Sequence, residues 1–311
     1  MAPPTVSYLN TAATPPSSFT DDQHRFHIAL MAFNALRLAP ALPGPDWKED
    51  LRAAREMQIA EGEFIEQERR MIRRDAADAP ADPCAFLAWF EQLCETGPGQ
   101  GDALFAWLAS SATLAQMRWF LTQEAAGEAG FDDLVALTQV RFPVQPKLEM
   151  ARNYWDEMGR GHERAMHSLM LSAVVDELKL LPSPESTLWE SLALANLMVA
   201  LALNRRYAYH AVGALGVIEM TAPSRVAQVN EGLKRLGVGV SGRMYFQLHA
   251  GLDVQHSQAW NREVIFPLVE RDPAVGRAIA EGALMRLASG ARCFRRYRAH
   301  FGEERVDTGT R

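Results

Sequence analysis

Apolar residues recur at helical spacing along most of the chain, and alternating, strand-like runs are rare. Ser18 or Thr20 can cap a first helix, in which Phe26, Leu30 and Phe33 follow one another at helical intervals. No Asn-Gly or Asp-Gly pair marks a hairpin. We therefore predict an all-α fold, with further helices in the first half at about 48–74, 84–96, 101–110 and 112–126.

The second half is predicted to form longer helices, separated by short stretches rich in proline, glycine and serine. These separators are LPSPES at 181–186, TAPS at 221–224 and LGVGVSG at 236–242. At the other end, residues 1–20 are rich in Pro, Ser, Thr and Ala, so we expect them to form a disordered leader. The helices expected in the second half are 145–180, 186–210, 211–221, 224–236, 241–257 and 273–300.

Composition narrows the class of protein. The net charge of -6 argues against non-specific electrostatic binding to nucleic acid or to an anionic membrane. The longest apolar stretch, at 192–203, is too short to span a bilayer. The 3 cysteines form no CxxC pair, and the first twenty residues lack the basic and apolar regions of a signal peptide. We expect a cytoplasmic protein that binds neither nucleic acid nor membranes.

The most informative chemistry lies in the segment YFQLHAGLDVQH. His249, Asp253 and His256 stand at positions i, i+4 and i+7, which places them within roughly 60° on one face of a helix. Their neighbours on the chain are largely apolar, so this face is expected to be buried. Two imidazoles and a carboxylate on one buried stripe are a suitable half-site for iron or manganese.

A second half-site needs carboxylates from other helices. Glu219 lies in a helix that is otherwise nearly uncharged, where an unpaired carboxylate is costly to bury. Glu124 follows an apolar helix face, and Glu157 precedes His167 by ten residues. Ten residues of regular helix extend about 15 Å, which is too far for both side chains to reach one metal. Gly159 and Gly161 lie between them, so we predict a distorted or mobile helix there.

The same segment contains a false zinc-protease motif. His162 and His167 are five residues apart, one more than in HExxH, and the extra residue turns them about 140° away from each other. We therefore predict that His162 and Glu163 are not zinc ligands.

The order Glu124, Glu157-x9-His167, Glu219 and His249-x3-Asp253-x2-His256 resembles that of the haem-oxygenase-like di-iron oxidases and oxygenases. The resemblance covers about residues 100–300, and FDDLVALTQ and NYWDEMGRG also look like bacterial members described as iron-containing redox enzymes. It implies a haem-oxygenase-like helical bundle at 99–303. It leaves 21–98 as accessory helices with a homodimer contact, and 304–311 as a tail.

Carried over by position, the resemblance implies a set of seven metal ligands. One iron would be held by Glu124, His167 and His256, and the other by Glu219, His249 and Asp253. Glu157 matches an additional carboxylate of members that oxygenate nitrogen. The interval between Glu124 and Glu157 is longer here than in the family, so Glu128 remains an alternative to Glu124, and Glu163 remains an alternative to Glu157.

The function implied is that of a non-haem di-iron oxygenase, an oxidoreductase with two iron ions as cofactor and O₂ as co-substrate. Such enzymes pass through a peroxo-di-iron(III) intermediate and take electrons from an external donor. We expect N-oxygenation of a small amine or amino acid in a biosynthetic pathway. The alternatives are desaturation or C–C cleavage of an amino acid or fatty acid, and a non-catalytic helical binding protein.

Overall fold

The computed structural model describes residues 19–127 and 130–302, which form helices and connecting turns without any strand. The all-α prediction is confirmed. Most of the predicted leader, the predicted tail and Glu128 lie outside the described residues.

The first half of the chain forms the helices that the apolar spacing predicts. Asp82 and Asp102 cap α3 and α4 by accepting hydrogen bonds from the backbone N–H groups of Ala85 and Leu104. One short helix, α6, was not predicted. The elements are α1 (Phe19–Leu38), α2 (Trp47–Ile72), α3 (Pro83–Thr96), α4 (Ala103–Ser110), α5 (Leu114–Gly127) and α6 (Phe131–Thr138).

The second half differs from the prediction at several points. The helix expected at 186–210 ends at Leu203, residues 208–210 belong to the next helix, and a short helix (Phe266–Arg271) was not predicted. The helix expected at 145–180 is two helices, and the pair expected at 211–221 and 224–236 is one helix that continues through Pro223. A short π-helical segment (Asn261–Ile265) joins α11 to α12. The elements are α7 (Val144–Glu157), α8 (His167–Glu177), α9 (Trp189–Leu203), α10 (Ala208–Arg235), α11 (Met244–Trp260), α12 (Phe266–Arg271) and α13 (Ala274–Phe301).

The break between α7 and α8 occurs where the glycines predicted a distortion. Gly159, Arg160 and Gly161 all have positive φ, at 61°, 53° and 83°, and two 3-10 turns replace the regular helix. A Cβ atom on Gly159 would lie 2.4 Å from the carbonyl carbon of Ala165, so only glycine allows the chain to fold back this closely. This reversal brings the end of α7 next to the start of α8.

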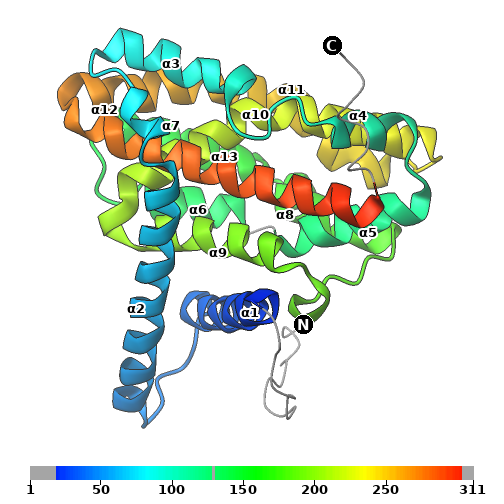
Figure 1. The fold of residues 1–311 in the computed structure, drawn as a ribbon, viewed down its shortest axis with the longest axis horizontal. Coiled ribbons are helices and arrows are strands. Elements are labelled where there is room, and N and C mark those ends of the chain that lie inside the picture. Colours follow the sequence, from blue (N-terminus) through cyan, green and yellow to red (C-terminus); the bar gives the residue numbers. More distant parts are fainter. Residues whose placement is uncertain (1–18, 128–129, 303–311) are drawn as a thin grey trace.

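Helices α10 and α13 run through the middle of the bundle, and each contributes to both apolar clusters of the core (Figure 1). They approach closely because each presents glycine to the other. A Cβ on Gly213 would lie 1.9 Å from the carbonyl oxygen of Ile279, and a Cβ on Gly282 would lie 1.9 Å from that of His210. Helix α11 packs along the other side of α10, so residues of α10 and α11 face each other.

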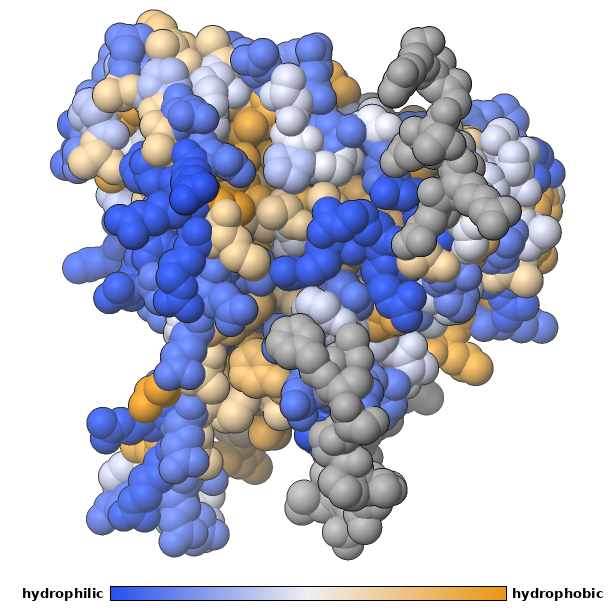
Figure 2. Space-filling model, in the orientation of Figure 1, coloured by the Kyte–Doolittle hydropathy of each residue, from blue (hydrophilic) through white to orange (hydrophobic). Residues whose placement is uncertain are grey.

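Helices α1 and α2 lie at the edge of the bundle. α1 packs against α9. The N-terminal part of α2 projects away from the other helices (Figure 1), whereas its C-terminal part contributes Phe64 and Ile65 to the core. Its outer part is mostly hydrophilic with separate hydrophobic side chains (Figure 2), including the exposed Trp47, Leu51 and Ile59. Among the described helices, none is long and apolar enough to cross a membrane.

Candidate metal centre

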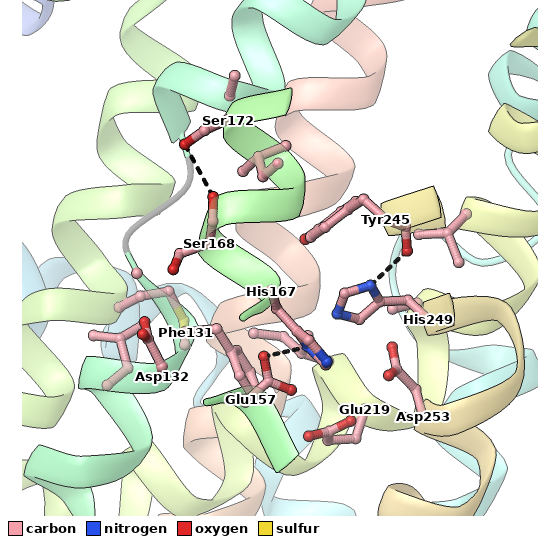
Figure 3. A pocket seen from close by; sticks show the side chains of 18 of the residues that line it. Phe131, Asp132, Glu157, His167, Ser168, Ser172, Glu219, Tyr245, His249 and Asp253 are labelled. Carbon is pink, nitrogen blue, oxygen red and sulfur yellow. Dashed lines mark hydrogen bonds and ion pairs between the residues drawn. The ribbon is translucent and has the colours of Figure 1, made fainter. Parts of the chain in front are cut away.

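Three carboxylates and three histidines converge between α7, α8, α10 and α11. Glu157 ends α7 and His167 begins α8, so the glycine-rich reversal places them opposite each other. Figure 3 shows Glu157, His167, Glu219, His249 and Asp253 pointing into one space. All of these side chains, and that of His256, are buried.

Five of the six side chains form two overlapping groups of possible metal ligands. Glu157, His167 and His249 each place a ligand atom within 4.8 Å of the others, and so do Glu157, Glu219 and His256. Glu157 therefore belongs to both groups. Asp253 lies beside His249 and Glu219, with its carboxylate turned toward the same space (Figure 3).

This grouping differs from the partition that the resemblance implies. His167 lies with His249, at a ring-centroid distance of 4.5 Å, and Glu219 lies with His256. Glu124 is in neither group. Its Oε1 accepts a hydrogen bond of 2.8 Å from the hydroxyl of Tyr297, in a neighbouring cavity.

The false zinc-protease motif lies away from this centre. His162 and Glu163 are exposed in the turns between α7 and α8, and neither belongs to a possible metal-ligand group in the described chain. The structure thus buries Glu157 against His167 and leaves its rival Glu163 in solvent.

Residues that the sequence did not single out orient the candidate ligands. His249 donates from Nδ1 to the carbonyl oxygen of Tyr245 at 2.7 Å, which leaves Nε2 as its ligand atom. His256 donates from Nε2 to Asp156 at 3.1 Å, and its Nδ1 faces Glu219 at 3.6 Å. Metal-binding histidines are commonly fixed in this way by a second hydrogen bond.

Asn153 orients one of the carboxylates in a similar way: its side-chain amide donates a hydrogen bond of 2.6 Å to Oε1 of Glu219. Asn153 and Asp156 lie on the same helix as Glu157, four and one residues before it. Position relative to Glu157 is the only sequence signal that could have indicated them.

Crowding of buried acids perturbs the protonation of the centre. Burial, followed by the charges of Glu219 and Glu157, raises the pKa of Asp253 to about 9. Burial also raises the pKa of Glu157. His256 is raised to a pKa of about 9, because the acids beside it, Glu219 first, outweigh the opposing effect of burial.

The pKa of His249 shifts in the opposite direction, downward. Burial, and then the neighbouring His167, lowers its pKa to about 4, so it is a neutral imidazole near neutral pH. A neutral imidazole is the form that binds metal. In the metal-free chain, protons balance the excess of acids, and a metal cation can replace them.

The unsatisfied polar atoms fit a cation as well. Within the described chain, Nδ1 of His167, Nδ1 of His256 and Oδ1 of Asp253 are buried without a hydrogen-bond partner. Nδ1 of His167 is 2.6 Å from Oε2 of Glu157, yet the two do not meet in hydrogen-bond geometry. Buried polar atoms are normally satisfied. The mixed nitrogen and oxygen donors suit iron or manganese.

A cavity of about 460 Å³ opens beside these residues. Its wall contains five of the six candidate ligands, the acidic Asp132 and Asp176, and apolar residues of α8, α9 and α10 (Figure 3). A volume of this size is within the range of small-molecule sites. The candidate ligands are therefore accessible to a small substrate.

Comparison with known proteins identifies the family. No curated protein matches the chain. A family model described as iron-containing redox enzyme matches residues 118–291, which is more than half of the chain and includes all the candidate ligands. The match confirms the expected resemblance and the haem-oxygenase-like fold. The chain belongs to this family of iron-containing redox enzymes, which are oxidoreductases.

Proposed function

We propose that the protein is a non-haem di-iron oxygenase that adds an oxygen atom to the nitrogen of a small amine or amino acid. The observation that carries this proposal is the pair of buried ligand groups that share Glu157. One such group suffices for a single ion. Two groups with a common carboxylate are the arrangement expected for two ions close together.

The side chains have distinct roles in this proposal. The three carboxylates Glu157, Glu219 and Asp253 would balance positive charge, and the three imidazoles would supply nitrogen donors. Asp156 and Asn153 hold His256 and Glu219 in place. Two iron ions held there would supply the electrons and the Lewis acidity needed to activate O₂. The protein keeps the ligands buried, which limits access of bulk water.

Two acidic residues on the cavity wall support the choice of an amine as substrate. Asp132 and Asp176 on its wall favour a cationic or hydrogen-bonding amine. Insertion of one oxygen atom into an N–H bond, with the other reduced to water, consumes two electrons and two protons. An external electron donor must supply these electrons in each turnover. Glu157 would add a further anionic oxygen donor, which stabilises ferric iron.

Two alternatives make different demands on the same cavity. Desaturation or C–C cleavage of an amino acid or fatty acid would use the apolar residues Leu171, Leu194 and Ile218 as the wall for an aliphatic chain. A non-catalytic binding protein would need no metal at all. The buried, mutually repelling acids favour the metal-binding function over the second alternative.

The test begins with anaerobic loading of the full chain with Fe(II) and determination of bound iron, for which we expect two ions per chain. Oxygen uptake by the loaded protein is then followed with an alkylamine, with lysine and with hexanoate, and products are identified by mass spectrometry. We expect hydroxylamine products from the amines. Acceleration by hexanoate alone would support the alternative oxidation, and absence of bound iron would refute an iron-dependent oxygenase.

A further inference from the structure

A second, smaller cavity adjoins the one at the metal centre. Its volume is about 180 Å³, and it lies between α4, α5, α8, α10 and α13. The two cavities share a mostly apolar wall, to which α10 contributes Ile218, Ala222 and Val226. The two cavities are therefore close neighbours on either side of the same side chains.

Arg225 is the most unusual residue of this second cavity. Its Nε and Nη2 atoms are buried and have no hydrogen-bond partner within residues 19–127 and 130–302. The guanidinium carbon lies 5.2 Å from the ring centre of Phe294 and 5.9 Å from that of Phe105. Ring faces hold the flat group in place but cannot accept in-plane N–H bonds, so both donors stay available.

The two available donors lie on one edge of the guanidinium. That edge presents two parallel N–H groups and binds a carboxylate through two hydrogen bonds. An unsatisfied buried donor is costly, and for a charged group the cost is larger than for a neutral one. A carboxylate from a ligand would remove this cost at Arg225.

The charges around the cavity also favour an anion. Arg225 and Arg286 both line it, and Glu124 is the acid on its wall. The Glu124 carboxylate accepts from the Tyr297 hydroxyl. Asp102, a further acid that acts on Arg225, is paired with Arg298.

Arg225 nevertheless keeps its charge near neutral pH. Burial, and then the neighbouring Arg286, lowers its pKa to about 10. A group with this pKa is still protonated at neutral pH. The cavity therefore presents a permanent cation with two open donors.

We propose that this cavity binds the carboxylate of the substrate and that Arg225 is the residue that contacts it. The inference rests on the proposed function only for the chemistry at the other end of the molecule. Glu219 and Arg225 are six residues apart on α10, which corresponds to about 9 Å along the helix. The substrate class is thus an aliphatic carboxylate whose amino group lies several bonds away, rather than a simple amine.

The experiment compares hexanoate with its uncharged analogue hexanamide by isothermal titration calorimetry on the full chain. It is done first without metal and then after anaerobic Fe(II) loading. We expect the wild-type protein to bind hexanoate at least about tenfold more tightly than hexanamide, because a hydrogen-bonded charge pair is lost with the amide. Arg225→Gln should abolish this preference. Arg295→Gln, at an exposed position on α13, should retain it.

A second variant covers the case in which Arg225→Gln does not fold, as judged by circular dichroism. Arg225→Lys keeps the charge but loses the paired donors, so the preference for hexanoate should be weaker than in the wild type and still present. Equal binding of both probes by the wild type would overturn the proposal. Absence of hexanoate binding, or wild-type affinity in the Arg225 variants, would also overturn it.

Iron dependence separates the two proposals. Hexanoate affinity that requires Fe(II) but not Arg225 places the carboxylate on the metal, which overturns this inference and supports the metal centre. Affinity that requires Arg225 in a chain that binds no iron supports the anion site, while the proposed di-iron function fails.

Discussion

Replacement of Asp253 by asparagine directly tests whether a cation belongs among the six converging side chains. In the metal-free protein, burial and the nearby Glu219 and Glu157 raise the pKa of Asp253 from 3.8 to about 9. The unfolded chain ionises this group at its ordinary pKa. The group therefore adds no penalty to the folded state below about pH 4, and stability falls as the pH rises from there toward 9.

The size of the effect follows from the shift. At about pH 7 the folded chain must keep a proton that the unfolded chain has released, which costs roughly 1.4 kcal/mol for each pH unit above 3.8. At about pH 7 the destabilisation from this group is therefore at most about 4 kcal/mol. An asparagine side chain at this position would have no such cost, although its amide must still be buried. We therefore expect Asp253→Asn to raise the stability of the metal-free protein by about 1–3 kcal/mol.

Iron should reverse the order of the two proteins. A cation that binds only the folded state stabilises it by about 2.7 kcal/mol at a hundred times its dissociation constant. We expect the wild type to show this gain on anaerobic addition of Fe(II) and Asp253→Asn to show little or none, because the variant lacks one of the three carboxylates that balance the metal charge. Oxygen uptake should be lost together with metal binding.

Thermal unfolding followed by circular dichroism measures both effects, with a shift of about 2–4 °C expected per kcal/mol. Asp132→Asn is the matched control, since Asp132 lines the same cavity but is not one of the six converging side chains. The advantage of Asp253→Asn should grow between pH 5 and pH 8. A metal-free variant less stable than the wild type, or one that still gains stability from Fe(II), would refute this reasoning.

Three further outcomes are expected. Asp156→Ala removes the acceptor that orients His256, so anaerobic titration should show Fe(II) affinity lowered about 10–100-fold without loss of helix content. Gly159→Ala should lower the free energy of unfolding in urea by about 1–3 kcal/mol or more, because the residue has positive φ and an added Cβ would clash with Ala165. Gly62→Ala is the control, since Gly62 lies in a helix with no atom near the added Cβ, and it should raise the free energy of unfolding by about 0.5–1 kcal/mol. We also propose that the homodimer contact expected within residues 21–98 involves the exposed Leu51 and Ile59 of α2. Light scattering should then give twice 34.6 kDa, and Leu51→Glu with Ile59→Glu should give the monomer; a wild-type monomer would contradict the proposal.

Two positions show how far the fold could be predicted from sequence. Gly159 indicated a distortion, and the chain does break there, but only the close approach to Ala165 determines that it folds back. Pro223 indicated a helix end, yet α10 continues through it. Proline cannot donate to the carbonyl oxygen of Glu219, four residues earlier, and buried packing against α11 and α13 outweighs that single lost bond.

The candidate site was predictable where one helix carries several ligands. His249, Asp253 and His256 share a face because helical spacing requires it. Their partners come from other helices, and the distance from Glu157 to His167 depends on a turn whose path the sequence does not specify. Asn153 and Asp156 have no distinctive pattern at all, since polar residues at a helix end are common. The spacing of residues along one helix cannot predict contacts between helices that are far apart in the sequence.

Glu124 is the residue on which sequence and structure differ most, and a substitution can decide between them. By position in the family pattern, Glu124 should be an iron ligand. In the structure its carboxylate accepts from Tyr297, in the cavity of Arg225, and burial raises its pKa. Glutamine keeps an oxygen that can accept from Tyr297 but is a poor substitute for a carboxylate on iron.

We therefore expect Glu124→Gln to retain the wild-type iron content after anaerobic loading, whereas Glu157→Gln, which changes the side chain common to both groups, should lose it. The hexanoate affinity of Glu124→Gln provides a second measurement. Loss of the Glu124 charge leaves Arg225 and Arg286 with less negative charge nearby, so hexanoate should bind as tightly as before or more tightly. If Glu124→Gln loses iron and Glu157→Gln keeps it, the ligand assignment drawn from the structure is wrong and the position in the family pattern is the better guide.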